Sequence, residues 1–533
     1  MHRGLQILEI VELLCAEVAG DLPRYGVGPP ECQHLAALAK TCKTFQDPAL
    51  DLLWSHQRNT MMNLLMCMPD DLWCLPVPTD VKLLGFQRPI TAVDWERPLT
   101  YMRRVKTFAC GLQTMPSPQL LQALSLSFPG EHFFPTLQKL YWSTPNTPHP
   151  PYIWRFISPK ITRTILTFGD SDHDLSLLPT VAISCPSMTD ATIYCPTRED
   201  VRRSVLQGIS RFVLGLAAIE SLSILDLDQA AFEHLAQLPT IKSLEIRRPD
   251  AFNPSCKISE GGVFLSLQRL KFNSIAPGSV ARFLHPFSDS PLVSLAMNVE
   301  PTSLAAPGLY SFVAENCSRA TLRDLHVGST ELVVSTPRRR AEPQIIRDDM
   351  IQPLLALTAL TSLCLYSRDG FDLDDSTLSG MAASWPDIER LDLMVASTYE
   401  GFTPRATLHS LYAFARHCPR LRMLKILFDA TVVPSTDADA EISQGALTCL
   451  SLGRSSIFAP AADVAAFLCG LFPVLQELHT GHHQRESEGY EDDQLLEDRV
   501  IFHRRWKQVE RLLPAHVEEE VEESGSESED EES

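Results

Sequence analysis

The sequence predicts an α/β solenoid, and three observations lead to that fold class. A six-residue pattern (apolar, two variable, apolar, one variable, apolar) recurs through most of the chain, for example as LQKLYW, IKSLEI and LQRLKF. Its fourteen copies start at residues 102, 137, 161, 188, 219, 241, 267, 292, 322, 360, 388, 421, 447 and 475, with an average step of about 29 residues. Helical spacing precedes many copies and ends at a proline, as in ADVAAFLCGLFP, because a helix must stop there.

Each copy is predicted to form a short strand. The last two apolar residues of the pattern alternate around one residue, so their side chains point to the same side of the strand. A single strand cannot bury that side, whereas strands stacked turn upon turn form a parallel sheet with a continuous apolar interior. The step lies near the upper end for leucine-rich repeats. We therefore predict an irregular leucine-rich-repeat horseshoe over residues 99–481, preceded by a linker or cap at 57–98.

The end of the chain changes in composition. Residues 482–515 are predicted to form a capping helix, because 491–513 is amphipathic and a solenoid needs its open end covered. Residues 516–533 are too charged to fold and are predicted to be a disordered acidic tail, in which Ser526 and Ser528 suit an acidophilic kinase. Arg338–Arg340 leaves two interpretations open, a nuclear signal or a solvated loop between repeats.

Charge and cysteine usage exclude several classes of protein. The formal net charge is −20, and the last seventeen residues hold ten acids and no base, which leaves −20 + 10 = −10 for the rest. We expect no nucleic-acid binding by such an acidic surface. No run of about 18 uncharged apolar residues is present, so no membrane span is expected. Fourteen scattered cysteines without a C-x-x-C pair indicate reduced thiols in the cytoplasm or nucleus.

The sequence contains no recognisable catalytic motif. A phosphate-cradling glycine loop, a nucleophile elbow and a zinc-protease helix are all absent from it. His479, His482 and His483 lie close together near the last predicted strand, but no cysteine is near them in the sequence. We therefore predict a protein that is not an enzyme and that holds no metal or cofactor.

The concave side of the predicted solenoid is the candidate surface for a target. Residues next to the apolar strand positions should face it, and basic residues outnumber acidic ones there. The candidates for target contact are Arg247, Arg269, Lys271, His326, Arg390 and Lys425, within a wider set that includes Arg104, Tyr366 and Asp392. Arginine pairs bidentately with carboxylates and phosphates, which favours an acidic or phosphorylated target segment, with the acidic tail as a competitor. The alternative is that these exposed positions are simply polar.

Residues 1–56 are predicted to form three short helices. In the first, Ile7, Ile10, Val11, Leu14 and Val18 recur at three- and four-residue steps and should lie on one face. The second carries Leu35 and Leu38, and the third should begin at Asp47-Pro48, with Asp47 as its N-cap. From the residues alone, these helices suit a small lid on the first turn of the repeat.

The same stretch resembles the F-box, in the form common in fungal F-box and leucine-rich-repeat proteins. The resemblance rests on LEIVELL, then LAALAKTCKTF, then PALDLLW, although this chain has Leu8 where proline is usual and a longer first link. It implies that the helices dock on the Skp-type adaptor of an SCF ubiquitin ligase, and through it on a cullin. The residues at the matching positions are Leu8, Ile10, Leu13, Leu14, Leu35, Leu38, Cys42, Phe45, Leu53 and Trp54. Trp54 would either anchor that interface or pack under the repeat.

The resemblance implies a substrate-recognition subunit of an SCF-type (cullin-RING) E3 ubiquitin ligase. The helices would bind the adaptor and the repeats would bind the target protein, so the chain would act by raising effective concentration. One alternative is a leucine-rich-repeat GTPase-activating protein, since such proteins also join repeats to an acidic tail. Another is a non-catalytic scaffold with a degenerate F-box. The sequence does not give the identity of the target.

Overall fold

A computed structural model of the chain describes sixteen segments and two compact units. The described residues are 7–19, 29–56, 60–74, 85–111, 114–143, 150–169, 171–195, 202–249, 263–275, 280–299, 308–329, 345–367, 369–395, 403–434, 442–481 and 493–513. The first unit is Met1–Ile246 and the second is Arg247–Ser533. The predictions for Arg338–Arg340, His482, His483, Ser526, Ser528 and the acidic tail concern residues outside the described segments.

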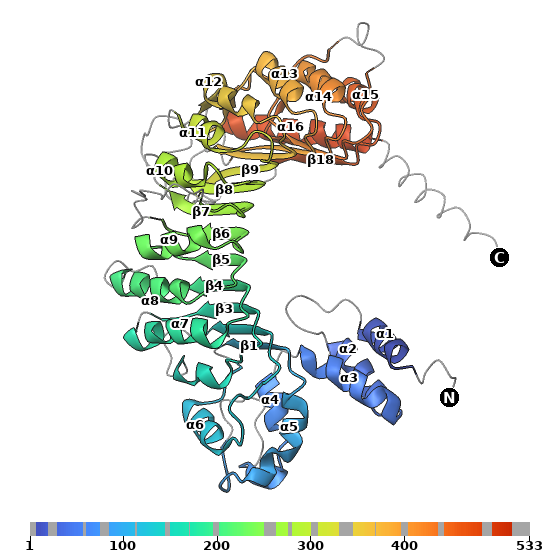
Figure 1. Ribbon diagram of the computed structural model, residues 1–533. Coiled ribbons are helices and arrows are strands. Elements are labelled where there is room, and N and C mark those ends of the chain that lie inside the picture. Colours follow the sequence, from blue (N-terminus) through green and yellow to red (C-terminus); the bar gives the residue numbers. More distant parts are fainter. Residues whose placement is uncertain are drawn as a thin grey trace, which may run out of the picture. The chain divides into compact units, whose positions relative to one another are not determined.

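Three helices open the first unit and pack on one another (Figure 1). They are α1 (Leu8–Ala19), α2 (Pro29–Ala39) and α3 (Lys43–Ser55). Their small core consists of Val11 and Cys15 from α1 and Ala49 from α3, with Leu38, Ala39, Phe45 and Leu52 packed around it. The predicted order of three short helices is thus found.

The predicted start of the third helix was wrong by five residues. The helix α3 begins at Lys43 with Cys42 as its N-cap, because the Cys42 carbonyl already accepts hydrogen bonds from the amides of Phe45 (3.2 Å) and Gln46 (3.1 Å). Pro48 therefore lies inside the helix, where its missing N–H removes a single backbone bond near the amino end. Asp47 is not a cap but an ion-pair partner of Arg104.

The rest of the first unit alternates helices and parallel strands. Its helices are α4 (Thr60–Leu65), α5 (Glu96–Met102), α6 (Pro118–Ser127), α7 (Asp172–Ser184), α8 (Arg202–Leu214) and α9 (Gln229–Gln237). Its strands are β1 (Thr107–Gly111), β2 (Lys139–Ser143), β3 (Arg163–Thr167), β4 (Asp190–Tyr194), β5 (Ser221–Ile224) and β6 (Ser243–Ile246). Each strand pairs in parallel with the next one in the chain. Stacked and tilted rings of Phe108, Phe133, Phe134 and Phe156 fill the first turns.

The second unit continues the same alternation. Its main strands are β7 (Arg269–Ile275), β8 (Ser294–Val299), β9 (Asp324–Ser329), β11 (Ser362–Ser367), β13 (Arg390–Val395), β14 (Met423–Lys425), β16 (Cys449–Gly453) and β18 (Glu477–Thr480). These strands are parallel, and each pairs with the next in this order. Two further parallel pairs join β10 (Ile346–Arg347) to β12 (Phe371–Asp372) and β15 (Asp429–Ala430) to β17 (Ser456–Ile457).

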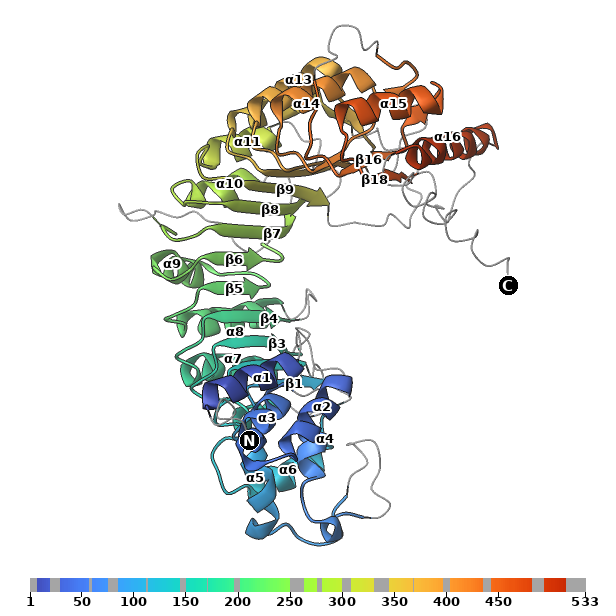
Figure 2. The same cartoon turned by 90° about the vertical axis from the view of Figure 1, so that its right-hand side faces the viewer.

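The helices of the second unit follow one another along one side of its strands (Figure 2). They are α10 (Val280–Leu284), α11 (Leu309–Asn316), α12 (Asp348–Ile351), α13 (Asp375–Ser384), α14 (Leu411–His417) and α15 (Ala461–Leu471). The last helix, α16 (Asp493–Arg511), packs on β17, β18 and α15. Trp506 and Val509 are fully buried in that contact, and the Trp506 indole donates to the Ser455 carbonyl at 2.9 Å.

The sequence pattern located the strands closely. Thirteen of the fourteen predicted copies are followed by a strand that begins two residues after the copy starts. The first copy was wrong by three residues, because Met102 ends α5 and the buried Val105 takes the position that precedes β1. The predicted α/β class is confirmed, because the structure contains a large parallel sheet together with helices. Among the described helices, none has the length and apolar character needed to cross a membrane.

Candidate docking and binding surfaces

The outward face of α1 is the most apolar exposed surface of the described helices. Large aliphatic side chains on this short helix, and Ile7 directly before it, are between 38% and 70% exposed, and Leu13 is the most exposed of them. They are Ile7, Leu8, Ile10, Leu13, Leu14 and Val18, and we call them the α1 outward face. Contiguous exposed aliphatic groups of this kind mark a surface that another molecule covers.

The helix α1 has two apolar sides, and the sequence analysis predicted them as a single face. Val11, Cys15 and Ala19 are buried at four-residue steps and form the side that packs on α2 and α3. At about 100° per residue, these three cover an arc of about 80°. Ile7, Ile10, Leu13, Leu14 and Val18 lie outside this arc, whereas Leu8 lies within it at the amino end of the helix. Val11 was predicted to lie with Ile10 and Leu14, and the structure instead places it in the internal core. The apolar arc is therefore wider than the neighbouring helices can cover.

The other predicted adaptor contacts lie at varied depths. Leu35 is buried, and Leu38 and Phe45 are partly buried against the three-helix core. Cys42 and Leu53 have intermediate exposure. Trp54 is buried and stacks on Tyr101 of α5 with ring centroids 4.6 Å apart, so of its two predicted positions the structure shows internal packing. The exposed members of the predicted set are thus those on α1.

The helix α3 is fixed to the start of the strands. Arg104 forms ion pairs with Asp47 (2.5 Å) and with Asp51 of this helix. The Lys106 amide donates to the Ser55 carbonyl at 3.2 Å, directly after the helix. Arg104 was predicted to face the concave side, and this prediction was wrong because the α3 carboxylates hold its guanidinium. The anchoring acts through α3 and leaves the α1 outward face free of these contacts.

A row of polar side chains crosses the strands of the second unit. Strand pairing aligns Lys271, Ala296, His326, Cys364, Asp392, Lys425, Ser451 and His479, one from each strand. A second row, two residues earlier, aligns Arg269, Ser294, Asp324, Ser362, Arg390, Met423, Cys449 and Glu477. We call these two rows the strand face of the second unit.

Asp392 organises the cations at the centre of this face. Its side chain is only 2% exposed, and its carboxylate lies 3.1 Å from the Arg390 guanidinium and 3.7 Å from the Lys425 ammonium. The oxygen that faces Lys425 accepts no hydrogen bond. Arg390 and Lys425 remain half exposed, so one buried negative charge holds two cations at the surface. Asp392 and Tyr366 were predicted to point to the concave side, and the structure buries both, so neither offers its side chain to a target.

Cys364 lies between His326 and Asp392 in the row. A cysteine next to a histidine and a carboxylate is the arrangement of residues found in nucleophilic cysteine sites. Burial raises the pKa of the Cys364 thiol to about 11, and the Asp392 charge adds to this. Burial also lowers the pKa of His326 below its usual value. A thiol with a raised pKa is a poor nucleophile at neutral pH. The three residues therefore do not form an activated cysteine site.

The predicted target residues form two groups on this face rather than one continuous line. Arg269 and Lys271 are exposed on β7, while Arg390 and Lys425 lie on β13 and β14. The aligned positions of β8 between them are the neutral Ser294 and Ala296, and His326 lies on β9. Arg247 follows β6 directly and has intermediate exposure.

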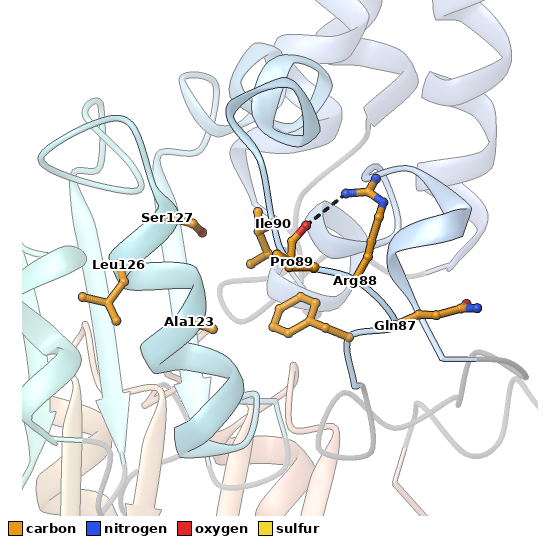
Figure 3. A pocket seen from close by; sticks show the side chains of 8 residues that line it. Gln87, Arg88, Pro89, Ile90, Ala123, Leu126 and Ser127 are labelled. Atoms are coloured by element: carbon orange, nitrogen blue, oxygen red, sulfur yellow. Dashed lines mark hydrogen bonds between the residues drawn. The ribbon is translucent and has the colours of Figure 1, made fainter.

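An open pocket of about 610 Å³ lies beside α6 in the first unit (Figure 3). Its lining is Phe86, Gln87, Arg88, Pro89, Ile90, Ala123, Leu126 and Ser127. The Arg88 guanidinium is already engaged by Asp71 (2.7 Å) and by the buried Asp94 (2.8 Å). These contacts hold the pKa of Asp94 well below its usual range. The pocket's one cation thus serves a structural ion pair, and its other lining groups are neutral.

Strand pairing also brings His479, which the sequence analysis singled out, next to two residues that it missed. Cys449 of β16 lies directly opposite Glu477 of β18, and His479 is two residues further along that strand. The sequence search looked for a cysteine near His479 along the chain, where there is none. Cys449 and Glu477 are 28 residues apart in the sequence (477 − 449 = 28), so their contact is found only when the strand register is known.

No protein-family model matches the chain, and a search of curated proteins finds no match either. Function is therefore inferred from the surfaces of the molecule itself.

Proposed function

We propose that this chain is the substrate-recognition subunit of an SCF-type ubiquitin ligase. The α1 outward face would dock on the Skp-type adaptor, and the strand face of the second unit would hold the target protein. The observation that carries the proposal is the set of five exposed aliphatic side chains on α1, with Ile7 directly before it, next to a separate buried face that holds the three helices together. The F-box resemblance of the same residues supplies the partner.

Burial of the α1 outward face supplies enough free energy for specific docking. Each large aliphatic side chain contributes about 1.5–3 kcal/mol when it is fully removed from water. Central residues of such a patch usually dominate binding, and truncation of a few of them costs about 2 kcal/mol or more each. Ile10 and Leu14 lie one helical turn apart and are the best placed to act together.

The parallel strands and their helices are proposed to be irregular leucine-rich repeats. Support comes from the buried residue that precedes each strand and from the pairing of each strand with the next within each unit. On the strand face, Arg390 and Lys425 exceed the charge of Asp392, and Arg269 and Lys271 add two exposed cations. This charge favours an acidic or phosphorylated segment of the target, which arginine contacts through paired hydrogen bonds.

A binding measurement with purified Skp-type adaptor tests the docking proposal. Wild type should bind, and the double substitution Ile10→Asp with Leu14→Asp should weaken binding by about 100-fold or more, since two carboxylates would be buried in an apolar contact. Ile183→Asp on α7 is the matched control, because Ile183 is 75% exposed and lies outside the three helices. This control should bind as wild type does.

Two results would count against the proposal. Equal adaptor binding by wild type and by the Ile10, Leu14 double variant would show that docking does not use α1. Absence of binding by wild type, together with stimulated GTP hydrolysis by the purified chain, would favour the GTPase-activating alternative.

A further inference from the structure

Three potential metal ligands meet on the last two strands of the second unit. The Cys449 sulfur, a Glu477 carboxylate oxygen and a His479 ring nitrogen all lie within 4.8 Å of one another. Direct pairing of Cys449 with Glu477 places their side chains on the same face, and the two-residue period of a strand adds His479 to that face. The backbone of both strands therefore fixes the positions from which the ligands project.

The spacing of these atoms is close to that of a zinc tetrahedron. The His479 Nε2 and Glu477 Oε2 atoms are 3.1 Å apart. Zinc bonds of about 2.0–2.3 Å to nitrogen, oxygen and sulfur give ligand-to-ligand distances of about 3.3–3.6 Å. The sulfur needs an approach of about 1.2 Å or less to complete this geometry. Glu477 and His479 are 63% and 60% exposed, so their side chains are free to make that adjustment.

The donor set selects the kind of ion. A thiolate and an imidazole favour zinc and related borderline or soft ions over calcium and magnesium, which prefer oxygen ligands. Cys449 is only 7% exposed, so its sulfur forms the floor of the site, while the two exposed ligands leave an open route from solvent. Three protein ligands would leave a fourth position for water.

The charges of the proposed ligands match the charge of a divalent cation. Burial and the neighbouring Glu477 carboxylate raise the pKa of the Cys449 thiol above its usual value, and Lys425 and Arg390 offset this only in part, so a bound ion would have to displace the thiol proton. A thiolate and the Glu477 carboxylate together carry two negative charges, which match one divalent cation. Without a cation, Glu477 and His479 are left as an exposed pair of a kind that stabilises little.

We propose that Cys449, Glu477 and His479 form a binding site for a zinc ion on the strand face of the second unit. The proposal is independent of adaptor docking, because it concerns another unit and other residues. A bound ion would cross-link β16 and β18 and would present one open coordination position to a ligand.

The test uses the full chain and two metal ions. Cobalt titration of wild type should give one equivalent of binding with an intense thiolate-to-metal absorption band, which zinc should displace. Cys449→Ser should abolish this band, and Glu477→Gln and His479→Ala should each weaken binding by about tenfold or more. Cys364→Ser is the matched control: Cys364 is a buried cysteine of the same face with His326 and Asp392 on opposite sides of it, and these three do not come together as the Cys449 group does, so the variant should behave as wild type.

Thermal unfolding gives a second readout. Zinc binds only the folded site, so excess zinc should raise the Tm of wild type and of Cys364→Ser but not of Glu477→Gln. Glu477 is exposed, so this substitution keeps the fold and separates ligand loss from misfolding. The proposal is overturned by a wild type that binds no ion at micromolar concentration. It is equally overturned by cobalt binding that survives both Cys449→Ser and Glu477→Gln unchanged.

Discussion

The α1 outward face and the strand face of the second unit are opposite in chemistry. The first consists of aliphatic side chains that offer no hydrogen bond, with Glu9 at its border and Glu17 between Leu13 and Ile10 on the helix surface. The second carries exposed cations around a buried carboxylate, with histidine and thiol groups in the same rows. Exposed hydrophobic residues gather on a helix at one end of the chain, and charged residues gather on paired strands.

This difference indicates two kinds of partner. An aliphatic surface recognises a fixed complementary shape, and its binding depends little on salt. A charged surface gives selectivity and fast encounter, and its binding weakens as ionic strength rises. The proposed function needs one surface of each kind: one that joins the ligase complex constantly and one that selects particular targets.

Trp54→Ala gives the largest expected effect and tests whether Trp54 lies outside the docking surface formed by α1. Trp54 is buried and stacked on Tyr101, so truncation should lower the free energy of unfolding of the first unit by about 3–5 kcal/mol. Urea unfolding of the full chain measures this, with Leu126→Ala, at an 80% exposed position, as a control that should change little. Folded Trp54→Ala that loses adaptor binding at wild-type stability would instead place Trp54 in the docking surface.

Charge reversal tests the second surface. Arg390→Glu with Lys425→Glu should weaken binding of an acidic phosphoserine peptide by about 10- to 100-fold, because two attractive contacts become repulsive. Fluorescence anisotropy at two salt concentrations measures the effect, and adaptor binding by the same variant should not change. An unchanged peptide affinity would exclude these cations from anion recognition.

Asp392→Asn should have a smaller effect in the opposite direction. The Asp392 carboxylate, 3.1 and 3.7 Å from the two cations, offsets part of their attraction for an anion, so its loss should tighten peptide binding by about 1 kcal/mol, or about fivefold. The same anisotropy assay measures it, with circular dichroism to verify folding. Weaker binding by a folded Asp392→Asn would show that the carboxylate orients Arg390 rather than competing with the ligand.

The smallest expected effect is a pH dependence of the strand face. Burial lowers the pKa of His326, so the imidazole is neutral near pH 7. A bound anion favours the protonated imidazole, so binding takes up a proton and should tighten by about threefold as the pH falls from about 7 to 5. A polyglutamate peptide is the suitable probe, and His326→Gln should remove the pH dependence. An identical pH profile in both proteins would exclude His326 from this surface.

Much of the fold followed from periodicity, because the pattern that marks each strand also marks the residues that must be buried. The sequence placed β2 and all later main strands, since the apolar residue two before each strand is buried in every case. It misplaced β1, where the end of α5 supplies Met102 as a competing apolar residue. It also misplaced the start of α3, where the Cys42 carbonyl and not the Asp47 side chain begins the helix.

The sites were less predictable, because they depend on contacts across the fold. Sequence spacing could not separate the buried Val11 from the exposed Ile10 and Leu14, since the two apolar arcs of α1 adjoin. The pairing of Arg104 with α3 joins residues far apart in the chain. The meeting of Cys449 with His479 depends on strand register, which no local motif encodes.

Hydrogen exchange in the presence and absence of the Skp-type adaptor is the most direct test of the proposal that α1 docks on the adaptor. If α1 is the docking helix, its amide exchange slows in the complex, and exchange across β13 and β14 does not change. Slowed exchange confined to the strands of the second unit, with α1 as exposed as in the free chain, would contradict it.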